Sequence, residues 1–164
     1  MLQIVDSELG AAEITDDALW RAGRWKAYLF SSSRRVVGFL LAERIQRGYV
    51  ARGGASGAVV MGEERPALLG VCRIWTAGEW RRRGVARRLL EEARQEFVYG
   101  LKVGRELVAF SQPTESGAAL ARGWWGELRE VHGNKENGKE KAETDETEDK
   151  GERGEGWLVY VEQD

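Results

Sequence analysis

Five arginines surround one glycine in the segment RRRGVARR, residues 81–88. A helix N-terminus presents unpaired backbone N–H groups and a partial positive charge, and a glycine such as Gly84 lets the backbone approach a bulky ligand closely. This combination favours the binding of an anion such as a phosphate group. A cationic, solvated start of a surface helix fits the same residues, so both interpretations stay open on these residues alone.

A strand and a helix must flank this glycine if it is to bind phosphate. The mostly apolar run Ala67–Trp75 predicts a central strand. After Gly84, apolar residues recur every four positions, which predicts a helix with one buried stripe and with Gly100 as its C-cap. The stripe consists of Val85, Leu89, Ala93 and Phe97.

The rest of the chain alternates between strand-like and helix-like runs. Strands are predicted over residues 2–7, 28–30, 36–45, 106–112 and 157–163, with a hairpin joining 28–30 to 36–45, and a short helix within 113–125. The glycine-rich residues 48–66 predict an irregular loop. Residues 134–156 contain no aliphatic side chain larger than alanine and predict a disordered acidic insertion. The alternation predicts one domain over 1–164 of the α/β or α+β class with a mixed sheet.

Composition narrows the class of protein further. The chain has 164 residues and a net charge of −2, so nothing suggests nucleic acid as a direct partner. One cysteine and one histidine exclude a disulfide framework and a Cys/His zinc cluster, so no metal is expected in this chain. No apolar run is long enough to span a bilayer and the N-terminus lacks a signal pattern, so we expect a soluble protein without a membrane partner.

Several motifs resemble one known enzyme family. RRRGVA fits the Arg/Gln-x-x-Gly-x-Gly/Ala motif with which the GCN5-related N-acetyltransferase (GNAT) superfamily grips the pyrophosphate of acetyl-coenzyme A (acetyl-CoA). VVGFLLAERIQRGY, GVCRIW, EFVYG, VAFSQPTESG and WLVYV follow in the order and approximate spacing of the cohesin acetyltransferases. The resemblance runs from about Lys26 to Val161. It implies the GNAT fold, with a mixed, mostly antiparallel central sheet flanked by helices.

The resemblance also implies an activity. Cohesin acetyltransferases transfer an acetyl group from acetyl-CoA to lysines on the ATPase head of the cohesin SMC subunit, which establishes sister chromatid cohesion in the nucleus. Whole members of the family carry a zinc finger and a peptide that binds the replication clamp, both upstream of the catalytic domain. Neither is visible in this sequence, so the clamp is expected as a partner only through regions absent here.

The residues that the resemblance implies for acetyl-CoA binding fall on three segments. Beside the pantetheine arm would lie Ile74, Trp75 and Thr76; at the pyrophosphate Arg82, Arg83, Gly84, Val85, Ala86 and Arg87; and near the other side of the cofactor Thr114, Glu115 and Ser116.

The group that removes the proton is harder to assign. A lysine ammonium, with a pKa of about 10.4, must lose a proton before it attacks, and the thioester oxygen needs a hydrogen-bond donor, which a splayed strand beside Arg73–Trp75 could supply as a backbone N–H. Many superfamily members use a glutamate on the strand before the phosphate loop, but ALLGVCRIW contains no carboxylate. The catalytic candidates are therefore Cys72, Gln112 and Glu91.

Each candidate has a competing interpretation. The Cys72 thiol accepts a proton, or it is a small buried hydrophobe. Gln112 orients the lysine or a water without titrating. Glu91 corresponds to a glutamate that the family needs, yet its helical phase, nearly opposite the buried stripe, equally fits an exposed helix glutamate.

Two other functions remain open on the sequence. One is a GNAT enzyme that acts on a small amine or a different protein, which predicts a compact acceptor pocket. The other is a module that holds the cofactor without turnover, which the missing carboxylate suggests.

Overall fold

A single seven-stranded sheet forms the centre of the computed structural model, which describes residues 1–12, 14, 19, 23–53, 59–111, 114–133 and 156–161. Its strands are β1 (Trp25–Ser32), β2 (Arg35–Arg44), β3 (Arg47–Gly53), β4 (Val59–Pro66), β5 (Leu69–Thr76), β6 (Val108–Ser111) and β7 (Leu158–Tyr160). The spatial order is β1-β2-β5-β6-β7-β3-β4. The helices are α1 (Leu2–Leu9), α3 (Val85–Glu96) and α4 (Glu115–Gly133), with 3-10 turns η1 (Gly78–Trp80) and η2 (Arg105–Leu107).

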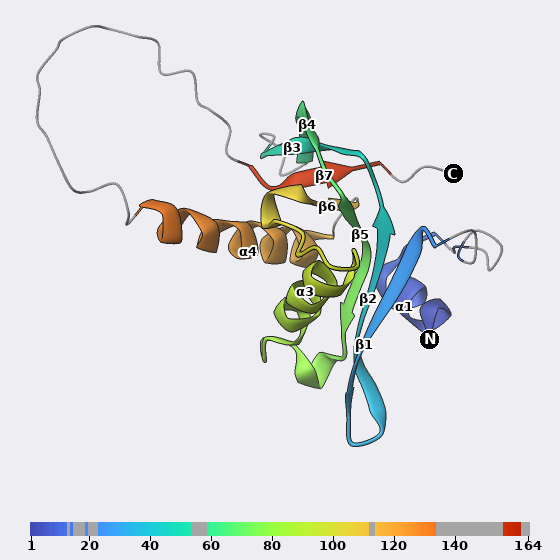
Figure 1. Cartoon of the computed structure of the whole chain (residues 1–164). Helices are drawn as coiled ribbons and strands as arrows, with labels where there is room; N and C mark the ends of the chain where they lie inside the picture. The colour runs from blue at the N-terminus through green and yellow to red at the C-terminus, as the bar shows by residue number, and fades with distance from the viewer. Residues whose placement is uncertain are drawn as a thin grey trace, which may run out of the picture.

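Strands β2 to β5 form one long hairpin that is bent in the middle (Figure 1). In one half β2 pairs with β5, and in the other half β3 pairs with β4, both antiparallel. Strands β6 and β7 lie between the two halves: β6 is parallel to β5 and to β7, and β7 is antiparallel to β3. The sheet is therefore mixed and mostly antiparallel, as the resemblance implies, and the two parallel pairs lie at its centre.

Helices cover both faces of the β2–β5 half of this sheet. Figure 1 shows α1 on one face and α3 on the other. Along β2, Leu40 packs in the cluster on the α3 side, while Phe39 and Leu41 pack with Val5 of α1. This alternation explains why the run from Val37 to Glu43 is buried throughout, because neither face of the strand is left to water.

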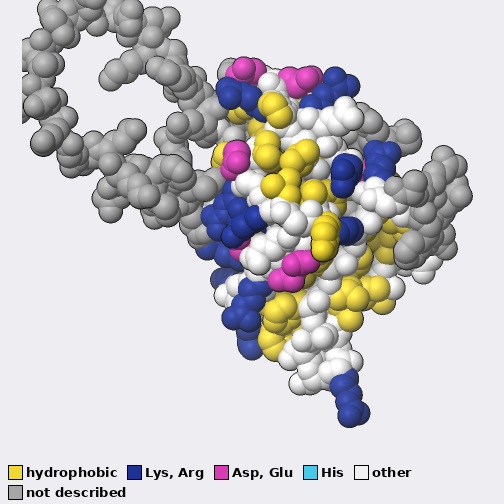
Figure 2. All heavy atoms as spheres, in the orientation of Figure 1, with side chains coloured by type: hydrophobic (Ala, Val, Ile, Leu, Met, Phe, Trp, Pro, Cys, Tyr) yellow, Lys and Arg dark blue, Asp and Glu magenta, His cyan; other side chains and the backbone are white. Residues whose placement is uncertain are grey.

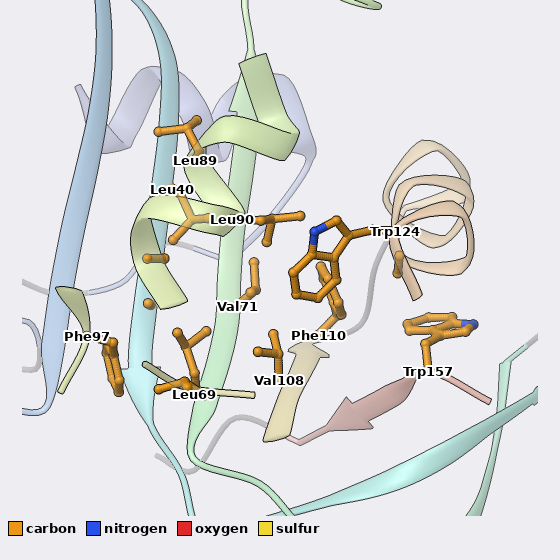
Figure 3. Close-up of a cluster of buried hydrophobic side chains, with 14 of the residues drawn as sticks. Leu40, Leu69, Val71, Leu89, Leu90, Phe97, Val108, Phe110, Trp124 and Trp157 are labelled. Carbon is orange, nitrogen blue, oxygen red and sulfur yellow. The ribbon is translucent and has the colours of Figure 1, made fainter. Parts of the chain in front are cut away.

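The predicted stripe of α3 is confirmed as its buried face. Val85, Leu89, Ala93 and Phe97 are each less than one-twentieth exposed. Figure 3 shows Leu89 and Leu90 from α3 against Leu40 and Val71 of the sheet, with Phe110 of β6 beside Trp124 of α4. Because Gly38 has no side chain, α3 can approach β2 closely at this point. A Cβ on Gly38 would lie 2.6 Å from Val85 Cγ1. The helix ends at Glu96 with Phe97 as its C-cap, so the prediction that Gly100 caps it is wrong; Gly100 lies in the turn that follows.

The first predicted strand, residues 2–7, is wrong, because this segment is helix α1. Leu2, Val5 and Leu9 all pack against the cluster on that face of the sheet, and their spacing of three and four residues is helical. Gly10 ends the helix in the left-handed conformation, with φ at 62°. The short apolar run at residues 2–5 fits a strand pattern as well. However, Ile4 is 57% exposed, so the run is not buried throughout as a central strand would be.

The predicted irregular loop over residues 48–66 is also wrong, because most of it forms β3 and β4, which pair from Arg47 with Pro66 to Gly53 with Val59. Gly48 serves packing and not a turn: a Cβ there would lie 3.1 Å from the Ala109 Cβ atom. Glycines and charged residues hid the strand pattern, and β4 is an edge strand, where charged side chains are common.

The remaining predicted elements differ mainly in length. The hairpin of β1 and β2, the central strand β5 and the final strand β7 are confirmed. Strand β6 is shorter than predicted because η2 precedes it, and the predicted short helix continues to Gly133. The predicted disordered insertion lies outside the described residues, apart from Gly156. No helix among the described residues is long and apolar enough to cross a membrane.

Candidate active site

Strands β5 and β6 separate at the centre of the sheet. Their parallel pairing ends where Val71 meets Phe110. Beyond that point β5 continues to Thr76 alongside β2, whereas β6 ends at Ser111. An opening therefore forms between the two strand ends, of the kind in which sheets commonly bind ligands.

A β-bulge at Cys72 sharpens this separation. On β2, Leu41 is opposite Arg73 and the next residue, Ala42, is opposite Val71, so the register between the two strands shifts at Cys72. Such bulges bend a strand and leave backbone groups outside the ladder, often beside active sites. The Cys72 carbonyl instead accepts hydrogen bonds from Ser111 Oγ at 3.2 Å and from Arg73 Nη1 at 3.0 Å.

The glycine among the arginines begins α3, as the sequence predicts. Gly84 is the N-cap and has φ at 80°, and Arg82 also has positive φ, at 59°. The first backbone bond of the helix runs from the Arg88 N–H to the Gly84 carbonyl at 3.0 Å, so the amides of residues 85–87 precede the helical ladder. A glycine N-cap has no side chain to accept from these amides, and the first turn contains no acidic residue. This first turn, at the positive end of the helix dipole, therefore favours an anion.

One groove joins the strand opening to this loop, with a volume of about 1290 Å³. Of the residues predicted to bind the cofactor, all line it except Arg83 and Glu115. Arg83 instead stacks over the Trp80 ring, 5.4 Å from its centroid, and Glu115 is exposed in the first turn of α4. Figure 2 shows Lys and Arg side chains gathered over α3, on one side of the molecule.

Of the three catalytic candidates, the structure places Cys72 in the groove. It is 5% exposed, and its Sγ accepts a hydrogen bond from Arg73 Nη1 at 3.1 Å. Gln112 lies outside the described residues. Glu91 is not among the groove-lining residues; its side chain points to a different partner set on α4 and η2.

Glu91 joins three elements through its carboxylate. Oε1 accepts from the Trp124 indole N–H at 3.0 Å and from Arg105 Nη2 at 2.7 Å, and Oε2 accepts from Arg94 Nη1 at 2.6 Å. Burial acts to raise the pKa of Glu91, but the hydrogen bonds from Trp124 and Arg105 and the charges of Arg94 and Arg105 outweigh it, and the pKa lies below its ordinary value. The side chain is 32% exposed, so Glu91 is a partly buried link and not the exposed helix glutamate of one sequence interpretation.

The structure adds groove residues that the sequence interpretation missed. Arg73 is buried in an ion pair with Asp6 of α1, 3.0 Å from Nε to Oδ1. Ser111 ends β6 inside the groove, and Glu8 of α1 lines it as well. Ser111 could have been found, because it follows a predicted strand directly. Asp6 and Glu8 could not, because the helix that carries them was taken for a strand.

The fold and the groove together define the class of protein. The sheet is mixed, its parallel central strands separate, and the opening lies beside an Arg/Gly loop at the start of a helix. This arrangement is the GNAT acetyltransferase fold. The solved structure of the xEco2 acetyltransferase domain bound to a K105-CoA conjugate aligns with 99% of this chain and 81% of that one, at 26% identity and a TM-score of 0.71. The family model for the ESCO1/2 acetyltransferase matches residues 65–132. These include β5, the arginine-rich residues 81–84 before α3 (the candidate phosphate loop) and most of α4. The chain therefore carries an N-acetyltransferase domain of the ESCO1/2 family.

Curated relatives agree with this assignment. N-acetyltransferase eso1 of Schizosaccharomyces pombe is 32% identical over 86% of this chain, but only 16% of that protein is covered. ESCO2 of Danio rerio is 38% identical over 73% of this chain and 22% of that protein. ECO1 of Yarrowia lipolytica is 33% identical over 78% of this chain and 45% of that protein. The chain thus spans less than half the length of these relatives.

Proposed function

We propose that this domain transfers the acetyl group of acetyl-CoA to lysines on the ATPase head of a cohesin SMC subunit, and that it thereby acts in sister chromatid cohesion in the nucleus. The observation that carries the acetyl-transfer part is the groove that runs from the strand opening at Cys72 to the amides after Gly84. The choice of acceptor is supported by the ESCO1/2 family match and by the K105-CoA conjugate in the xEco2 structure.

The groove suits a CoA molecule at both ends. The amides of residues 85–87 would bind its pyrophosphate, with Arg82 and Arg87 supplying charge at the same end. A Cβ on Gly84 would meet no atom within 4 Å, so this corner is open to a bulky group. Ile74 and Thr76 line the middle of the groove, where an extended arm would lie along β5. When bound, acetyl-CoA supplies the activated acetyl thioester.

The residues at the bulge would provide the catalytic environment. Because the register between β2 and β5 shifts at Cys72 and bends the strand, a backbone N–H at this bulge would donate to the thioester oxygen as charge develops there. The Ser111 hydroxyl and the Arg73 guanidinium both donate to the Cys72 carbonyl, which fixes the orientation of this peptide group. A donor held in advance needs no reorganisation during the reaction.

The lysine ammonium must give up a proton. Besides water and the Glu8 carboxylate, the candidate acceptor that we consider among the described groove residues is the sulfur of Cys72. Arg73 Nη1 donates a hydrogen bond to this sulfur at 3.1 Å, which holds the side chain of Cys72 in the groove. We propose Cys72 and Gln112 as the residues beside the acceptor nitrogen, and Glu91 as a residue that holds α3 in place.

The function is tested by incubating the domain with acetyl-CoA and a recombinant SMC ATPase head, followed by tandem mass spectrometry of the head. We expect acetyl-lysine on the head well above the level without enzyme, which measures non-enzymatic acetylation. Small polyamines and aminoglycosides serve as alternative acceptors in parallel reactions. Acetylation of a small amine alone would assign a different GNAT activity, and cofactor binding with no acceptor would identify a binding module.

A further inference from the structure

The charges that line the groove are almost all positive. Among the described lining residues, the cationic side chains are Arg73, Arg81, Arg82 and Arg87, and the only acidic side chain is that of Glu8. The charge of Arg73 is matched by Asp6, and both side chains are only 6% exposed. The remaining three arginines lie around the phosphate loop. Among the described lining residues, Glu8 is therefore the one negatively charged side chain that an incoming cation could contact.

Glu8 is held in a defined position. The indole N–H of Trp75 donates to Glu8 Oε2 at 2.6 Å, and the Trp75 side chain is itself buried, 8% exposed. The bond anchors one carboxylate oxygen of α1 to strand β5. Within the described residues, Glu8 Oε1 makes no hydrogen bond, so one oxygen of a fixed, charged carboxylate remains available as an acceptor.

Helix α1 brings this carboxylate to the groove from one face of the sheet. Helix α1 covers the face of the sheet opposite α3 (Figure 1), and the residues after Glu8, Leu9 to Ala12, continue along the groove. The groove thus has arginines near the start of α3 and one carboxylate, that of Glu8, on α1. A phosphate-bearing ligand is drawn to the first and an ammonium group to the second.

We propose that Glu8 binds the acceptor lysine, by pairing its carboxylate with the lysine ammonium as the acceptor segment enters the groove from the α1 side. This inference rests on the proposed function, because it takes the acceptor to be a lysine. An ammonium has three N–H donors and no acceptor, so the free oxygen of Glu8 matches it. Glu8 is solvent-exposed, and water screens the pair, so the gain in affinity is about fivefold.

Glu8→Gln isolates the charge. Glutamine keeps an oxygen that can accept from the Trp75 indole N–H, so α1 stays anchored while the negative charge is lost. Glu63→Gln is the matched control: Glu63 is exposed on β4, does not line the groove, and its loss changes the net charge equally.

The test compares two fluorescent peptides from the SMC head, identical except for lysine or norleucine at the acceptor position, by their affinity for the CoA-saturated domain. We expect the unmodified domain and Glu63→Gln to prefer the lysine peptide about fivefold, and added salt to reduce this preference. In Glu8→Gln the preference should fall to about one, with unchanged CoA affinity. A preference that survives in Glu8→Gln, or that is absent from the unmodified domain, would overturn the inference.

Acetylation of the lysine peptide is measured in parallel with acetyl-CoA. If the peptide is acetylated but Glu8→Gln retains the preference, only the role of Glu8 fails. If Glu8→Gln loses the preference but no variant acetylates any peptide, the role of Glu8 stands and the proposed transfer fails.

Discussion

Gly84→Asp should weaken acetyl-CoA binding by about a hundredfold or more, measured by isothermal titration calorimetry. The new carboxylate would project from the N-cap of α3, where the amides of residues 85–87 and the neighbouring arginines favour an anion. It would occupy the anion position and repel the pyrophosphate. The φ of 80° adds strain for any residue with a Cβ, although no atom lies within 4 Å of it.

Gly84→Asn separates charge from strain. Asparagine has nearly the same size as aspartate, tolerates the left-handed region, and is neutral. We expect it to weaken binding by about tenfold at most, with the far-ultraviolet circular dichroism of both variants unchanged. If asparagine and aspartate weaken binding equally, the effect is one of backbone shape, and the electrostatic account of this loop is wrong.

Glu91→Ala should lower the free energy of unfolding by about 3 kcal/mol in urea denaturation. The substitution leaves the indole N–H of Trp124, a residue with 0% exposure, without its acceptor, and removes the carboxylate between Arg94 and Arg105. Glu92→Ala, at the next and exposed position of α3, should change stability by about 0.5 kcal/mol or less. Equal stability of the two variants would contradict the structural role of Glu91.

The Glu91 carboxylate also predicts how the stability of the domain changes as the pH falls. The pKa of Glu91 is lower in the folded state, so its contribution to stability is complete above the pKa of the unfolded carboxyl, about 4.3, and is lost as the pH falls through the lower folded value. The stability difference between the unmodified domain and Glu91→Gln should therefore shrink on going from about pH 6 to about pH 3. A difference that stays constant over this range would show that Glu91 is not ionised in the link.

The elements around the phosphate loop could be predicted because their local signals agree. Strand β5 is a continuous apolar run, and α3 combines a four-residue apolar repeat with a glycine at its start. Both are buried as their patterns indicate, since one packs on the other. The GNAT fold followed from these elements together with the resemblance of the flanking motifs.

The elements that failed have signals that depend on distant parts of the chain. Helix α1 has only eight residues, and its apolar side is defined by the sheet face on which it packs. Strands β3 and β4 need glycine at Gly48 because Ala109 of β6 approaches it, a contact between residues far apart in sequence. Short elements of this kind take their conformation from tertiary packing more than from intrinsic propensity.

The residues of the site also fall into a group that local sequence signals predict and a group that depends on distant parts of the chain. The cofactor segments could be assigned from motifs, because the backbone of a phosphate loop requires glycine at a fixed place. The surroundings of Cys72 could not, because the bulge appears only in the register between β2 and β5, and Arg73, Asp6 and Ser111 meet there from three elements. The link around Glu91 likewise depends on α4 and η2 lying beside α3.

A crystal structure of the domain with acetyl-CoA tests the central claim most directly. The account predicts electron density for the pyrophosphate within hydrogen-bond distance of the amides of residues 85–87, and the thioester between β5 and β6 beside Cys72. An empty groove, with the cofactor bound elsewhere on the domain, would contradict it.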